Sequence, residues 1–121
     1  MSAPRIPILK VGKNLLATMH GDLHDRIADA FQSDLLTTIE KTGAAGVVID
    51  ISGLDEVDTY VARVLADTAR MARLMGTRSV LVGMRPEVAA TLVRMGYDMK
   101  GVETALDVDQ GLALLASPVS F

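Results

Sequence analysis

One stretch of the chain decides its fold: Val47-Val48-Ile49-Asp50-Ile51-Ser52-Gly53-Leu54-Asp55-Glu56-Val57-Asp58-Thr59-Tyr60. Residues 47–51 are almost wholly apolar and rich in β-branched side chains, which predicts a central strand covered by neighbouring elements. A short acidic loop follows this strand. Asp58 is a favourable N-cap, so a helix is expected to begin at Thr59 and to extend over 59–75.

Strand and helix patterns alternate before this stretch. The runs 6–10 and 15–19 are strand-like and flank the turn residues Gly12 and Asn14, which predicts an antiparallel hairpin. A helix over 23–41 is expected next. Its apolar residues recur at helical spacing and form one stripe: Ile27, Ala30, Phe31, Leu35 and Ile39.

The helix over 59–75 is expected to pack on the sheet, and Gly76 suits the position just after its end. Its predicted buried stripe consists of Val61, Val64, Leu65, Thr68, Met71, Ala72 and Met75. Because Met71 and Met75 fall on this stripe, we interpret them as packing residues and not as a methionine-rich binding surface.

The last third of the chain is expected to form four elements: a buried strand over 79–83, a short helix that Pro86 begins and Gly96 closes, a weak strand over 102–105 and a helix that Asp107 begins. A glutamine three residues after that aspartate completes the pattern of a capping box.

The order of these elements is β-β-α-β-α-β-α-β-α, which indicates an α/β fold. Strands that alternate with helices pair in parallel, so we expect a mostly parallel mixed sheet with the opening hairpin as its antiparallel part and helices packed on it. Residues 1–121 have a length that suits a single domain. The predicted core includes Val48, Ile49, Val64, Leu65, Val80 and Leu81.

Composition narrows the functional classes. Half of the residues are hydrophobic and 22% are charged, which is typical of a folded domain. The lack of cysteine excludes disulfides, thiolate catalysis and cysteine zinc sites. A net charge of −3 lacks the basic surplus of a general nucleic-acid binder and favours protein or small-molecule partners. No apolar run suits a signal peptide or a membrane span, so a cytoplasmic location without membrane binding is expected.

The acidic loop and the helix start after the central strand form the candidate site. In open α/β sheets, partners tend to meet the loops at the carboxyl ends of strands. Because Asp58 is the better cap, the Thr59 hydroxyl has no evident capping role and is expected to face water. The helix dipole would favour a phosphate there, whereas Asp55, Glu56 and Asp58 would oppose it. A phosphorylation switch at Thr59 is therefore a hypothesis; from the pattern alone, helix capping is the preferred interpretation of these residues.

Other residues admit a catalytic or metal-binding interpretation. His20 and His24 would suit a metal or acid–base cluster, or simply polar surface near a helix start. Asp50 would suit catalysis, although a carboxylate that holds loop amides is the preferred interpretation. The sequence has no Walker loop, dinucleotide fingerprint or nucleophile elbow, so we expect no enzyme activity, no cofactor and no metal.

Two further patterns leave alternatives open. A basic strip for nucleic acid would consist of Arg63, Arg70, Arg73 and Arg78. Asp67 lies four residues after Arg63 and three before Arg70, so surface ion pairs are the preferred explanation.

Thr91 and Ser52 are secondary candidates for phosphorylation, the first inside a short helix and the second in a turn.

The segment that runs from residue 48 to Asp58 and Thr59 resembles the STAS family (anti-sigma-factor antagonists). Members of this family carry a phosphorylatable serine or threonine after an aspartate at the start of their second helix. The predicted element order is similar to theirs, and the resemblance covers nearly the whole chain. The segments that resemble RsbS-type stressosome scaffolds are 6–10, 31–36, 42–50, 74–76 and 103–107. Threonine departs from the serine usual in that branch, and 58–62 and 82–87 are more similar to RsbR-type domains.

The resemblance implies a regulatory scaffold and not an enzyme. Scaffolds of this type assemble with RsbR-type STAS sensor proteins and hold an RsbT-type serine/threonine switch kinase. The kinase phosphorylates the scaffold, leaves it and activates a downstream pathway; an RsbX-type phosphatase and homo- or hetero-oligomers are also implied. Carried onto this chain, the phosphoacceptor is Thr59, and Asp55, Glu56 and Asp58 belong to the partner-binding surface. The alternatives are a ligand-binding STAS module and a free anti-sigma-factor antagonist that binds an anti-sigma kinase.

Overall fold

The computed structural model describes residues 5–96 and 102–117, which form a five-stranded sheet with four helices. The strands are β1 (Ile8–Val11), β2 (Asn14–Gly21), β3 (Gly46–Leu54), β4 (Arg78–Val82) and β5 (Glu103–Ala105). They lie in sequence order, with β1 and β2 antiparallel and every later pair parallel. The predicted fold class and the opening hairpin are therefore confirmed, and the predicted elements differ from the observed ones mainly at their ends.

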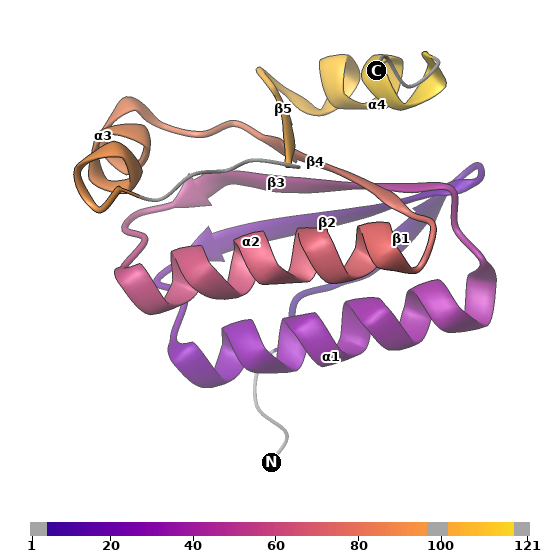
Figure 1. The fold of residues 1–121 in the computed structure, drawn as a ribbon, viewed down its shortest axis with the longest axis horizontal. Helices are drawn as coiled ribbons and strands as arrows, with labels where there is room; N and C mark the ends of the chain where they lie inside the picture. The colour runs from indigo at the N-terminus through magenta and orange to yellow at the C-terminus, as the bar shows by residue number, and fades with distance from the viewer. Residues whose placement is uncertain (1–4, 97–101, 118–121) are drawn as a thin grey trace.

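The helices cover both faces of the sheet. They are α1 (Asp25–Thr42), α2 (Thr59–Leu74), α3 (Pro86–Arg94) and α4 (Val108–Ala116). Figure 1 shows α1 and α2 side by side along one face and α4 on the opposite face, whereas α3 lies beyond the arrowhead of β3. Because parallel strands end on the same side of a sheet, α3 and the start of α2 both lie at the carboxyl ends of the strands.

The larger core lies between the sheet and the α1–α2 pair. Its largest fully buried side chains include Phe31, Leu15, Met19, Leu35, Ile49, Leu54 and Leu81. The smaller core lies under α4, where Val48, Val80 and Val82 are fully buried. Val48, Ile49, Val80 and Leu81 are buried as predicted, and so are Val64 and Leu65 of α2. On the predicted stripe of α1, Ile27 and Ala30 are only partly buried.

The start and end of α2 agree with prediction, but its methionines do not. Asp58 caps the helix by accepting the Val61 N–H at 2.8 Å, and Gly76 follows the last turn with a φ of 91°. Met71 and Met75 are 40% and 43% exposed, so their assignment to the core is wrong. The buried arc of α2 is turned toward its alanines, which leaves Met71 at the margin, and Met75 lies past the last turn.

The central strand is longer than predicted. β2 continues to Gly21 and pairs with β3 through Gly21 and Leu54, after a register shift between Thr18 and His20. The pairing keeps the chain extended beyond residue 51, where the sequence predicts the acidic loop. Ser52 consequently lies in β3, and its predicted place in a turn is wrong.

Candidate functional site

The loop between β3 and α2 is fixed at both of its ends. The Asp55 N–H donates to the Gly21 carbonyl at 3.2 Å, which anchors the loop to the end of β2. Val57 is half-buried and packs against the cluster of Ala62, Val88 and Leu92 between α2 and α3. With this apolar anchor inside, the acidic side chains of the loop are left on the surface.

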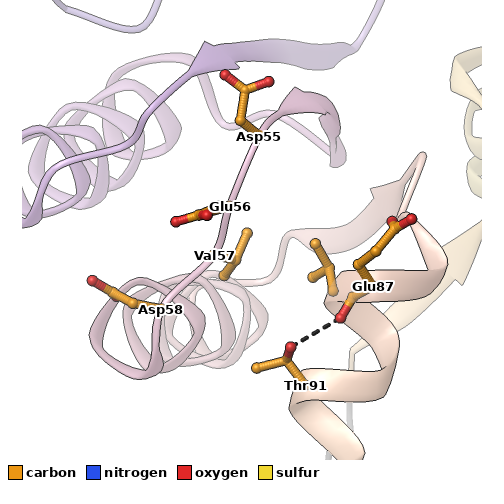
Figure 2. Close-up of a pocket in the computed structure, with 7 residues that line it drawn as sticks. Asp55, Glu56, Val57, Asp58, Glu87 and Thr91 are labelled. Carbon is orange, nitrogen blue, oxygen red and sulfur yellow. Dashed lines mark hydrogen bonds between the residues drawn. The ribbon is translucent and has the colours of Figure 1, made fainter.

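A cleft of about 300 Å³ separates the loop from α3. It is lined by Asp55, Glu56, Val57, Asp58, Glu87, Val88 and Thr91. Figure 2 shows that the carboxylates of Glu56 and Asp58 point away from α3 and do not converge with that of Glu87. Within residues 5–96 and 102–117, no group of acidic or histidine side chains could hold a metal ion. The cleft is therefore an open acidic surface.

Thr59 is the first residue of α2 and is exposed. Its Oγ1 donates a hydrogen bond of 3.0 Å to the Sδ atom of Met95, the C-cap residue that follows α3. A thioether is a weak acceptor, so this bond is easily exchanged for water. The helix start is capped by Asp58, as the sequence predicts, and the Thr59 hydroxyl has no part in the cap.

The next residue connects α2 to α1. The Tyr60 hydroxyl donates to the two carboxylate oxygens of Asp29 at 2.7 and 3.0 Å. This hydrogen bond is the largest cause that raises the pKa of Tyr60 above its ordinary value, followed by desolvation and by the charges of Asp29 and Asp25. The first turn of α2 thus contacts α3 through Thr59 and α1 through Tyr60.

The secondary phosphorylation candidates are held differently. The Thr91 hydroxyl donates to the carbonyl of Glu87 at 2.9 Å, a bond within α3 that Figure 2 marks, and the residue is half-buried. Ser52 is exposed, but its N–H donates to Asp50 and its carbonyl accepts from Arg85, at 2.9 and 3.2 Å. Thr91 is thus less accessible than Thr59, and Ser52 lies on a paired strand.

The residues with a catalytic interpretation are not gathered at this site. Asp50 accepts the Ser52 N–H at 2.9 Å, which agrees with the predicted role of a carboxylate that holds backbone amides. His20 lies near the end of β2, and His24 stands before α1 without a capping bond from its side chain. Both histidines are exposed.

The arginines do not form a uniform basic strip. Arg78 makes a double hydrogen bond to Glu103 at 2.6 and 3.0 Å, which raises the pKa of Arg78. Arg70 pairs with Asp67 at 3.3 Å, as the spacing predicts, whereas the predicted pairing of Arg63 with Asp67 is not seen. Arg70 and Arg78 are therefore each held by a carboxylate.

Sequence reasoning missed two contacts of the site, those of Met95 and Asp29. Each lies more than thirty residues from its partner on α2. Both contacts depend on how α1 and α3 pack against α2, and no local sequence pattern specifies that packing.

Comparisons with known proteins agree with this architecture. A family model described as "STAS domain" matches residues 5–111. The "RsbT co-antagonist protein RsbRA" of Bacillus subtilis (strain 168) is 32% identical over 118 residues, which cover 89% of this chain and 42% of that protein. RsbRB of the same organism is 31% identical and covers 88% of this chain and 39% of that protein. The chain thus spans about two fifths of the length of these curated relatives.

Two solved structures are similar over almost their whole length. A serine-to-glutamate variant of RsbS from Moorella thermoacetica gives a TM-score of 0.82 at 40% identity and covers 92% of this chain and 94% of its own. A chain described under "Molecular architecture of the stressosome, a signal integration and transduction hub" gives 0.77 at 38% identity, with 91% and 96% covered. The match of the family model to residues 5–111 is supported by the order of the strands and by the start of a helix at Thr59. The chain belongs to the STAS-domain family.

Proposed function

We propose that this protein is a non-catalytic regulatory scaffold of a stressosome-type signalling complex, made of a single STAS domain and located in the cytoplasm. It holds a serine/threonine switch kinase and releases it when Thr59 is phosphorylated. The observation that carries the proposal is the exposed Thr59 hydroxyl, which leaves the capping of α2 to Asp58 and donates a hydrogen bond to a thioether. A kinase can therefore use the hydroxyl without unfolding the helix.

The relatives support the choice of partners. RsbRA and RsbRB are each described as a co-antagonist of RsbT, and the stressosome chain is similar over 96% of its length. We therefore infer an RsbT-like switch kinase, RsbR-like STAS sensor proteins and an RsbX-like phosphatase as partners, with assembly into homo- or hetero-oligomers. Within residues 5–96 and 102–117, none of the helices combines the length and apolar character that crossing a bilayer requires.

The physical basis of the switch is a change of surface charge at fixed fold. A phosphate on Thr59 adds about −1.5 to −2 charges at neutral pH. Asp55, Glu56, Asp58 and Glu87 already make the adjoining cleft acidic. A partner docked over the loop would then meet added negative charge that must be desolvated, which weakens binding. The loop stays anchored by Val57, so release needs no rearrangement of the core.

The test is phosphorylation of the chain by an RsbT-type kinase with ATP, followed by intact-mass measurement and peptide mapping. We expect a single phosphate on Thr59 in the wild type and in the Thr91→Ala control, and none in Thr59→Ala. Thr59→Ser should accept phosphate at least as fast, because it removes the methyl group beside the hydroxyl. Kinase retention on the immobilised scaffold should fall as the phosphate is added.

Other outcomes would point elsewhere. Phosphate in Thr59→Ala would place the acceptor at another residue. An unmodified chain that still retains the kinase would be a passive scaffold, with Thr59 reduced to a helix-start residue. Retention of an anti-sigma kinase in place of the switch kinase would identify a free anti-sigma-factor antagonist.

A further inference from the structure

Two exposed arginines, Arg63 and Arg94, are close in sequence to the two residues that meet at the Thr59 hydroxyl. Arg63 follows Thr59 by four residues on α2, and both are exposed. Arg94 directly precedes Met95, whose sulfur accepts the Thr59 hydrogen bond. In the described part of the chain, neither Arg63 nor Arg94 makes a hydrogen bond or an ion pair. The natural helical partner of Arg63, Asp67, is bonded to Arg70 instead.

Helix geometry places Arg63 within reach of a group on Thr59. Side chains four residues apart lie on the same face of a helix, with their Cβ atoms about 5–6 Å apart. A phosphate extends the Thr59 side chain, and the arginine stem is long and flexible. An acidic group that precedes a basic one by four residues is the favourable order, because it also suits the helix dipole.

Arg94 reaches the same place from α3. Glu87, Thr91 and Arg94 share one helical stripe because they are spaced by four and three residues, and Glu87 and Thr91 line the acidic cleft. Arg94 is at the end of this stripe that lies beside Met95, and therefore near Thr59. The cleft is lined by carboxylates, whereas the two arginines lie outside its lining.

We propose that Arg63 and Arg94 bind the phosphate of phosphorylated Thr59 and hold it between α2 and α3. The inference rests on the proposed function, because it concerns the modified state of the same residue. Phosphorylation removes the hydroxyl proton and with it the bond to Met95. Charge-assisted bonds from two guanidinium groups replace that weak contact. The phosphate therefore has a fixed position, although Asp55, Glu56, Asp58 and Glu87 repel it.

The test installs the phosphate chemically, so that it does not depend on any kinase. Full-length protein with phosphothreonine at position 59 is made by peptide ligation or by genetically encoded phosphothreonine. Phosphorus NMR then gives the second pKa of the phosphate, which lies at about 6 without neighbours. The protein is compared with the Arg63→Gln and Arg94→Gln variants. Arg73→Gln is the matched control, since it removes the same charge from the far end of α2, about 20 Å away.

We expect the second pKa to rise by about half a unit in Arg63→Gln and in Arg94→Gln, because each loses a cation that favours the dianion. Arg73→Gln should leave it unchanged, and unphosphorylated variants should keep the wild-type circular dichroism. The proposal is overturned if either Arg63→Gln or Arg94→Gln behaves like Arg73→Gln. Failure of a kinase to modify Thr59 would refute the proposed switch but leave this result unaffected.

Discussion

Replacement of Asp58 by alanine tests whether capping and phosphate acceptance are divided between neighbouring residues. The Asp58 carboxylate accepts the Val61 N–H at 2.8 Å and is the side-chain cap of α2. Loss of such a bond costs about 1 kcal/mol, with a range of about 0.5–2. Loss of a negative charge beside the helix N-terminus adds about 0.3 kcal/mol at an exposed position. Asp58→Ala should therefore lower the free energy of unfolding by about 1.3 kcal/mol and Tm by about 4–8 °C.

Two variants serve as controls in the same assay, urea unfolding followed by far-ultraviolet circular dichroism. Asp58→Asn keeps a capping oxygen and should lose no more than about 0.5 kcal/mol. Thr59→Ala loses only an exposed bond to sulfur and gains helix propensity, so it should stay within about 0.5 kcal/mol of the wild type. The reasoning is refuted if Thr59→Ala destabilises the protein as much as Asp58→Ala, because Thr59 would then support the helix start itself.

Three further changes test the packing and the tyrosine contact. Leu65→Ala should lower the free energy of unfolding by about 2–5 kcal/mol, because Leu65 is only 2% exposed. The control is Leu74→Ala on the same helix. Leu74 is 89% exposed, so this change should alter the free energy of unfolding by less than about 0.5 kcal/mol. Gly111→Ala should lower the free energy of unfolding by about 1–3 kcal/mol despite the better helix propensity of alanine, because the added Cβ would meet Val82 Cγ1 at 2.9 Å. Thermal unfolding measures this loss of stability. A rise in Tm would contradict the close packing of α4. The raised pKa of Tyr60 means that its hydrogen bond stabilises the fold fully below the unfolded pKa of about 10 and is lost as pH rises through the folded value. Asp29→Asn should lower that pKa, measured by tyrosinate absorbance in a Tyr97→Phe background, and no change would show that Asp29 is not its cause.

The central part of the fold was predictable because local and global signals agree there. The apolar run before Asp50 is buried on both faces, and Asp58 has the cap geometry that its residue type favours. The position of the candidate phosphoacceptor follows from the same two features. Sequence alone therefore places Thr59 at the start of a helix next to a buried strand.

What the sequence did not predict depends on contacts between distant elements. The extension of β3 through Ser52 comes from pairing with the end of β2, after a register shift that leaves no local pattern. Met71 has helical spacing suited to the core, but the buried side of α2 is set by its small alanines. The contact between Thr59 and Met95 needs the position of α3, which lies beyond the edge of the sheet.

The unequal covering of the sheet has a consequence for local opening. α4 packs over a small group of fully buried valines, whereas α1 and α2 cover the larger core on the other face. Helices that bury little apolar surface open at a lower free energy than the global unfolding reaction, and their amides exchange with solvent sooner. Detachment of α4 would leave the α1–α2 layer in place, together with the loop before Thr59 (Figure 1). Opening of α4 is therefore expected to leave the capped start of α2 unchanged, because Asp58 and Val61 lie in the layer on the other face of the sheet.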